Sequence, residues 1–255
     1  MESLVFYQYA LIALIFMWSG LVRSALGFGG VALALPFLLI IDDRPQIYLP
    51  IMAAHLLVFS STTVITNHRL AKKGIAEPTV AWSFLGKALL IMIIPKCIGV
   101  FGLITLPTQI INTIIFTIIG LYSMTYVLNY HIESKHKFAD LMFLIVGGYI
   151  SGASLIGAPL IVAVFSKYVS RYQLRDTLFV LWFILVCVKM GSFVIADIDL
   201  QLIHHLWLLP CAALGHILGS RIHQYLLTTD SVKFYRVLGS ALLVSSAVGL
   251  LKAWL

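Results

Sequence analysis

The sequence predicts an all-α, polytopic membrane protein. Hydrophobic residues make up 61% of its 255 residues and charged residues only 11%, whereas a soluble domain is about a quarter charged. The mean hydropathy is +1.01, and the apolar residues fall into about eight long segments separated by charged or turn-forming residues. The net charge of +7 comes from short loops between these segments. It therefore favours an orienting role in the bilayer over binding to nucleic acid.

The eight segments account for nearly the whole chain. They cover residues 4–41, 47–66, 79–104, 109–129, 139–166, 176–196, 201–220 and 234–254. Six of them have the length of a single helix that crosses a bilayer. No stretch between them is long or polar enough for a soluble domain, so residues 1–255 form one transmembrane domain.

The first segment, residues 4–41, is too long for one crossing. At ~1.5 Å per residue, a continuous helix would be nearly twice the ~30 Å thickness of the hydrocarbon core. Gly20, Gly27, Gly29 and Gly30 favour unwinding in its middle, where Arg23 also lies. Irregular backbone at this depth lines a cavity or is buried in protein, and many transporters build substrate sites from such broken helices.

The fifth segment, residues 139–166, repeats this pattern. The residues aligned are Gly20, Phe28 and Gly29 with Gly148, Ile156 and Gly157, and further on Gly99 and Gly102 with Gly215 and Gly219. Pro159 is suited to the start of a restarted helix, where its missing N–H costs nothing. The chain therefore contains two repeats, about 1–130 and about 138–255.

The distribution of Lys and Arg relates the two repeats to each other. These residues gather in four loops, within 67–74, 130–138, 167–175 and 221–236, which the positive-inside rule places in the cytoplasm. The second and third loops flank segment 139–166, so this segment enters and returns on one side as a helix–break–helix hairpin. By analogy 4–41 does the same, which makes the repeats inverted. The alternative is eight plain crossings with a weak charge bias.

Four cations lie inside the spans: Arg23, Lys87, Lys96 and Lys189. The ten acidic residues all lie at or near segment ends, so a mobile anion is the natural partner of these cations. Lys96 is near the outer end of its span and is expected to extend to the interface. The same explanation stays open for Lys189.

The helix breaks also favour an anion site, because restarted helices present free N–H groups and positive dipole ends. The predicted substrate-binding residues are Arg23, Ser24, Gly27, Phe28, Gly29, Gly30, His55, Lys87, Ser151, Gly152, Gly157, Ala158 and Pro159. Arg23 would supply a bidentate fork for carboxylate, sulfonate or phosphate. Histidines with pKa values near neutrality keep proton coupling open.

Other classes of protein fit less well. Residues 148–152 do not match the spacing of a serine-hydrolase motif, and the chain has no HExxH zinc motif. The three cysteines lie in apolar segments without metal-ligand spacing, so neither a metal nor a cofactor is expected. A passive anion channel and a transporter of a small carboxylate remain alternatives to a transporter of other anions.

Two motifs resemble those of the sulfite exporter TauE/SafE family. They are Gly27-Phe28-Gly29-Gly30 followed by Pro36, and Ser151-Gly152 through Ile156-Gly157-Ala158-Pro159. The resemblance implies a bacterial inner-membrane transporter of sulfite, thiosulfate, organosulfonates such as sulfoacetate, or in some members other carboxylates. Leu155 and Ala158 stand where that family usually has Gly, and Arg23 replaces a small residue. Our hypothesis is that Arg23 offsets a narrower second break by supplying charge directly.

Overall fold

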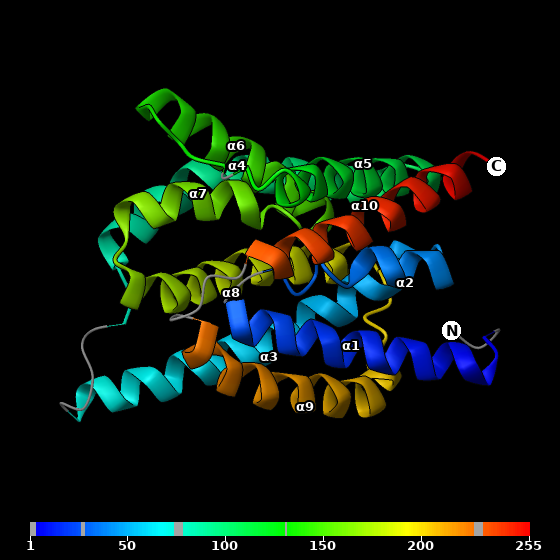
Figure 1. The fold of residues 1–255 in the computed structure, drawn as a ribbon, viewed down its shortest axis with the longest axis horizontal. Helices are drawn as coiled ribbons and strands as arrows, with labels where there is room; N and C mark the ends of the chain where they lie inside the picture. The colour runs from blue at the N-terminus through cyan, green and yellow to red at the C-terminus, as the bar shows by residue number, and fades with distance from the viewer. Residues whose placement is uncertain (1–3, 27–28, 74–78, 131, 227–231) are drawn as a thin grey trace. The chain divides into compact units, whose positions relative to one another are not determined.

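The computed structural model describes residues 4–26, 29–73, 79–130, 132–226 and 232–255. Over these ranges the chain forms ten helices and no strand, labelled in Figure 1. The helices are α1 (Phe6–Leu26), α2 (Leu35–Ile41), α3 (Pro45–Lys72), α4 (Trp82–Thr105), α5 (Thr108–Val127), α6 (Lys137–Ser154), α7 (Ala158–Tyr168), α8 (Arg171–Ile195), α9 (Leu202–Leu226) and α10 (Val232–Trp254). The all-α prediction is confirmed. Segments 4–41 and 139–166 are each split into two helices.

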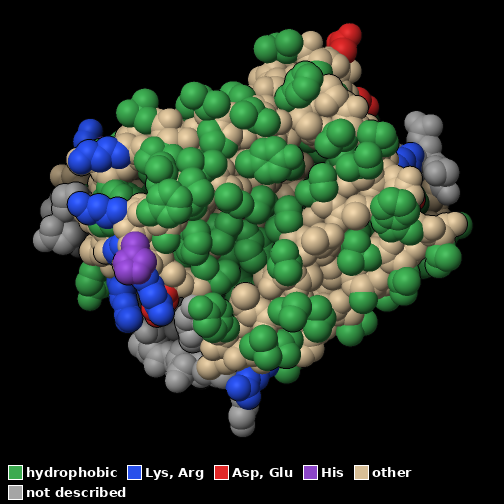
Figure 2. All heavy atoms as spheres, turned by 90° about the horizontal axis from the view of Figure 1, so that it is seen from above, with side chains coloured by type: hydrophobic (Ala, Val, Ile, Leu, Met, Phe, Trp, Pro, Cys, Tyr) green, Lys and Arg blue, Asp and Glu red, His purple; other side chains and the backbone are tan. Residues whose placement is uncertain are grey.

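Seven of the described helices are long and apolar enough to cross a membrane: α1, α3, α4, α5, α8, α9 and α10. From residue 90 onward, the large exposed hydrophobic side chains of α4 are Leu90, Ile94, Ile98 and Phe101. They recur every three or four residues and so share one face of the helix. Hydrophobic side chains also dominate the face shown in Figure 2, with charged side chains toward its edges. Apolar faces turned outward belong to a multi-pass membrane protein, whose solvent is lipid.

The chain folds as two compact units. Unit 1 consists of Met1–Ile51, Thr105–Ile132 and Asp199–Leu255, and unit 2 of Met52–Ile104 and Glu133–Ile198. Unit 1 thus holds α1, α2, α5, α9 and α10, unit 2 holds α4, α6, α7 and α8, and α3 contributes to both. The units do not coincide with the sequence repeats, because each unit combines helices from both halves of the chain. Each unit contains one broken helix pair.

In unit 1, α1 packs against α9 at a close crossing that needs glycine. A Cβ atom on Gly215 would lie 1.8 Å from Met17 O, and one on Gly20 would lie 2.2 Å from Ala212 O. Both obstacles are backbone atoms, which cannot rotate away. Small residues allow such close approach of membrane helices, where dispersion replaces the hydrophobic effect as the driving force.

Unit 2 uses the same construction where α4 meets α6. A Cβ atom on Gly99 would lie 2.1 Å from Tyr149 O, and one on Gly152 would lie 2.3 Å from Lys96 O. Gly99 therefore makes the same kind of contact as Gly215, the residue with which it is aligned between the two sequence repeats. Gly20, however, corresponds by its contacts to Gly152, one helical turn beyond Gly148.

The α6–α7 pair is a hairpin whose two open ends are tied together. Asp140, in the first turn of α6, accepts hydrogen bonds from Lys167 Nζ at 3.1 and 3.2 Å and from Tyr168 Oη at 2.5 Å, both at the end of α7. Phe84 of α4 stacks on Tyr168 and meets the ring of Phe165 edge-on. Because the first turn of α6 meets the last turn of α7, segment 139–166 returns to the side from which it entered.

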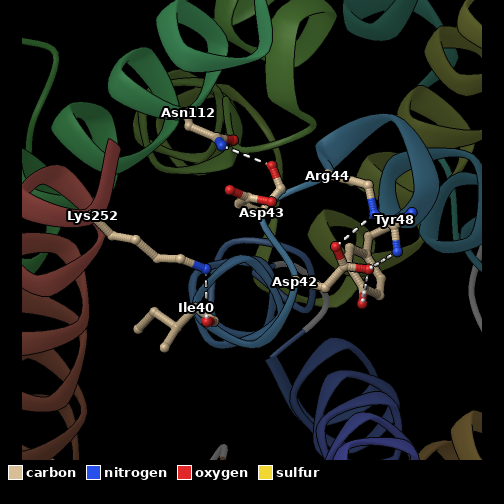
Figure 3. Close-up of polar contacts among 7 residues, drawn as sticks. All are labelled: Ile40, Asp42, Asp43, Arg44, Tyr48, Asn112 and Lys252. Atoms are coloured by element: carbon tan, nitrogen blue, oxygen red, sulfur yellow. Dashed lines mark hydrogen bonds and ion pairs between the residues drawn. The ribbon is translucent and has the colours of Figure 1, made fainter. Parts of the chain in front are cut away.

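The turn from α2 into α3 in unit 1 is held by polar contacts, shown in Figure 3. Arg44 donates two hydrogen bonds to the carboxylate of Asp42 at 2.7 and 2.8 Å, and Tyr48 Oη donates to the same group at 3.2 Å. From other helices, Lys252 Nζ of α10 and Asn112 Nδ2 of α5 donate to backbone carbonyls. The acceptor of Lys252 is Ile40 O, which lies in the last turn of α2, where the helix leaves its carbonyls unpaired.

Candidate functional site

The first helix break follows α1 in unit 1. Gly27 and Phe28 lie outside the described residues. Beyond them Gly29 has a φ of +81°, in the left-handed region that favours glycine. Gly30 then lies against α1: Ser19 Oγ donates to Gly30 O at 3.0 Å, and a Cβ atom on Gly30 would be 2.8 Å from Arg23 Cβ. The chain therefore turns back on the last two turns of α1.

Arg23 and Ser24 are both buried in unit 1, with 6% and 3% of their surface exposed. Ser24 Oγ shares a hydrogen bond with His216 Nδ1 of α9. His216 directly follows Gly215, so the glycine crossing of α1 and α9 brings this ring to the break. The predicted site residues omit His216, because the sequence does not show which helix packs against α1.

The second break, in unit 2, separates α6 from α7. Leu155 ends α6 in a left-handed conformation, with a φ of 62°, and its N–H donates to Ser151 O at 3.1 Å. A non-glycine residue pays about 1–2 kcal/mol for this conformation, a cost that a glycine at this position would avoid. Gly157, Ala158 and Pro159 then begin α7. A Cβ atom on Gly157 would lie 2.1 Å from Gly147 O, so only glycine fits where α7 starts on the surface of α6.

Two lysines meet the end of α6 in unit 2. Lys96 of α4 donates from Nζ to Ser151 O at 2.9 Å and to Ser151 Oγ at 3.0 Å. Lys189 of α8 donates from Nζ to Gly152 O at 2.8 Å and lies 5.6 Å from the centre of the Phe193 ring. Both lysines are 0% exposed. The expectation that Lys96 extends to the membrane interface is therefore wrong, and Lys189 does not extend there either.

The local reason is the chemistry of a helix end. Carbonyls near the end of a helix can accept further hydrogen bonds, as Ser151 O does beside its bond from Leu155 N–H, and the dipole makes that end negative, so cations are favoured there. Because α6 ends inside unit 2 at the break, its acceptors draw the lysines inward. Ser151 and Gly152, both predicted site residues, are thus contacted by side chains that the prediction left out.

The two remaining predicted residues lie elsewhere in the described structure. His55 is buried in α3, with its ring edge-on to Phe59 at 6.4 Å between centroids. Lys87 is exposed on α4. Nine residues separate it from Lys96, which places the two side chains on roughly opposite faces of an α-helix. Lys87 is therefore not brought to the second break with Lys96.

Each break gathers polar side chains of kinds that bind small anions in proteins. The first break has a buried guanidinium, a hydroxyl and an imidazole, and the second has two buried ammonium groups and a hydroxyl. Among the residues that the structure describes, no group of three His, Cys, Asp or Glu side chains could hold a metal ion. Broken helices lined by cations within a multi-pass helical protein are typical of membrane transporters.

The family is shown by comparison with known proteins. The model of the family described as "Sulfite exporter TauE/SafE" matches residues 12–250, so this chain belongs to that family. The resemblance seen in the two glycine motifs is confirmed, and the protein belongs to a family of transporters, not of enzymes. Comparisons with curated proteins and with solved structures gave no match.

Proposed function

We propose that this protein transports small sulfur-containing anions, namely sulfite, thiosulfate or an organosulfonate, across the bacterial inner membrane. The family supplies the class of substrate. The observation that carries the proposal is the burial of Arg23, Lys96 and Lys189 inside spans whose acidic residues lie at or near segment ends. Buried cations in a membrane mark an ion pathway or a partner of opposite charge.

The substrate site is proposed to use the two breaks. Candidate residues of the first break are Arg23, Ser24, Gly29 and Gly30 together with Gly27 and Phe28, and those of the second are Ser151, Gly152, Gly157, Ala158 and Pro159. Burial of Arg23 beside Gly30 supports the first group, and the start of α7 over Ser151 supports the second. His55 and Lys87 stay candidates on weaker support, since Lys87 is exposed.

Inverted repeats are also part of the proposal. The paired contacts of Gly99 with Tyr149 and of Gly215 with Met17 support this relation. In each case a glycine of the third long helix of one half meets the first helix of the other half. This exchange is the pattern that two symmetry-related repeats would produce.

The alternatives make different predictions for flux. A passive channel moves anions without saturation, and a carboxylate transporter prefers acetate to any sulfur oxyanion. Proton coupling is included as a proposal because the Ser24–His216 hydrogen bond places an imidazole beside the first break, and imidazole titrates near neutral pH. A pH gradient would then accelerate flux.

The test is anion flux in proteoliposomes. Sulfite, thiosulfate, sulfoacetate, taurine and acetate are supplied one at a time, with and without a pH gradient. We expect saturable flux of at least one sulfur oxyanion in the wild type. Arg23→Gln should reduce kcat/KM about tenfold or more, because the charge-assisted hydrogen bonds of the guanidinium are lost. The exposed Arg221 of α9 in the same unit supplies the control Arg221→Gln, which should behave as wild type.

Three outcomes would contradict parts of this proposal. Unsaturable flux of all five compounds would establish a channel instead. Wild-type kinetics in Arg23→Gln would reject the role of Arg23. Absence of both flux and binding for every anion would reject the proposed function.

A further inference from the structure

Lys96 and Lys189 converge on one turn of α6 from two different helices of unit 2. Their Nζ atoms donate to the carbonyls of consecutive residues, Ser151 and Gly152. Consecutive carbonyls in a helix are only a few ångströms apart, so the two ammonium groups share a small volume. Neither side chain has any exposed surface.

Capping of α6 explains only part of this arrangement. The unpaired carbonyls of a last turn need hydrogen-bond donors, which a neutral amide or hydroxyl supplies equally well. An ammonium group has three N–H donors. Lys96 uses two of them on Ser151, and Lys189 uses one on Gly152. One donor on Lys96 and two on Lys189 are left for another acceptor.

The charge of the two lysines is not balanced by carboxylates in the described part of unit 2. The ion pairs there join Asp140 to Lys167 and Asp176 to Arg175. Asp140 lies in the first turn of α6, at the end opposite to Ser151. Buried charges in proteins are normally paired, so this positive centre calls for an anion from outside the chain.

The start of α7 adds to the same positive potential. A Cβ atom on Gly157 would lie 2.9 Å from Ser151 N, so α7 begins against the turn of α6 that the lysines contact. The first N–H groups of an α-helix are unpaired and carry the positive end of its dipole. The two lysines supply most of the positive charge at this turn, and the helix terminus adds to it.

We propose that Lys96 and Lys189 form an oxyanion site in unit 2 that binds the SO3 group of the transported substrate. The proposal rests on the function proposed above and deepens it. Sulfite, thiosulfate and sulfonates share three terminal oxygens on one sulfur, which match the three remaining N–H donors. A carboxylate has only two oxygens, in one plane, so it cannot offer a separate oxygen to each of the three donors. Both lysines are fully buried, so the proposed site has no exposed surface in this structure.

The test is equilibrium binding to the purified full-length protein in detergent, with radiolabelled sulfite, thiosulfate and sulfoacetate as probes. Lys96→Gln and Lys189→Gln keep an N–H donor for the α6 carbonyls and remove the charge. Each should raise Kd about tenfold or more, because charge-assisted hydrogen bonds are lost, and the double variant should show no saturable binding. Lys137→Gln, at the exposed start of α6, is the matched control and should bind as wild type.

The outcomes separate this proposal from the proposed function. Unchanged Kd values in both Gln variants, with saturable binding in the wild type, would show that the lysines only cap α6. The proposed function would then survive. A wild type that neither binds nor transports any of the three anions would overturn both. If a Gln variant does not fold, a competition experiment on the wild type still tests the proposal. Thiosulfate should displace bound sulfite more effectively than acetate or chloride does. Equal displacement by all three would contradict a site for three oxygens.

Discussion

Substitution of Gly215 by alanine tests the close crossing of α1 and α9. The new Cβ atom would lie 1.8 Å from Met17 O, 2.8 Å from Met17 C and 2.9 Å from Leu21 N. All three are backbone atoms, so the clash is relieved only if the two helices move apart or bend. Separation would also weaken the neighbouring contact of Gly20 with Ala212 O.

The size of the effect follows from the geometry. Inserting a methyl group into a well-packed interface typically lowers the free energy of unfolding by ~1–3 kcal/mol. Because the Cβ atom of Gly215→Ala would clash with backbone atoms, which cannot rotate away, we expect a loss near the upper value, about 3 kcal/mol. For a chain of this size 1 kcal/mol corresponds to roughly 2–4 °C in Tm. We therefore expect Tm to fall by about 6–12 °C.

The assay is thermal unfolding of purified protein in detergent, followed by intrinsic tryptophan fluorescence. The matched control is Gly191→Ala in α8, where an added Cβ would meet nothing within 4 Å. Alanine is a better helix former than glycine by up to ~1 kcal/mol, so this control should leave Tm unchanged or slightly higher. A Gly215→Ala variant that melts with the control would refute the close crossing.

The remaining predictions concern polar groups at the ends of helices in unit 2. Burial alone would raise the pKa of Asp140, but hydrogen bonds from Ser134, Tyr168 and Lys167 outweigh it and hold this pKa below its ordinary value of 3.8. Its carboxylate therefore stabilises the hairpin above that value and loses this contribution as the pH falls through the lowered pKa. Asp140→Asn should flatten the acid limb of a plot of Tm against pH, and an unchanged limb would count against the tie between α6 and α7. Asn67 donates to both oxygens of Asp176, which is 2% exposed. Asn67→Ala should cost about 1–3 kcal/mol in denaturant unfolding because a buried acceptor loses its donor, whereas Asn67→Asp, which places two carboxylates together, should cost more.

The topology of the second hairpin was predictable because loops rich in Lys and Arg are expected on the same, cytoplasmic side of the membrane. Basic residues on both sides of 139–166 required its ends to meet, and the contacts of Asp140 with Lys167 and Tyr168 show that they do. The positions of both breaks were predictable from glycine, since few other residues tolerate interrupted helices packed this closely. In the same way, Gly157 lies where no side chain fits.

The partners at each break were not predictable in this way. Lys96 was assigned to the interface from its distance along α4, but its position is decided by the carbonyl and hydroxyl oxygens of Ser151 in α6, 55 residues away in the chain. His216 reaches Ser24 only because α9 packs on α1. A single sequence shows the periodicity of apolar residues within a helix and the residues at which the helix starts, breaks or ends. It does not show which helix will be its neighbour, and at both breaks the neighbouring helix supplies the polar groups.

The pairing of helices in unit 1 also sets the order in which this protein can mature. The partner of α1 is α9, and Ser24 and His216 are 192 residues apart in the chain. At a synthesis rate of ~5–20 residues per second, the ribosome takes roughly 10–40 s to supply that partner. Lys252, which caps α2 at Ile40, arrives later still, 212 residues after its acceptor. During this interval α1 must wait in the membrane with the face around Gly20 uncovered. A truncated chain that ends before α9 is therefore expected to be a substrate for membrane proteases, even though every element of its first half has been inserted.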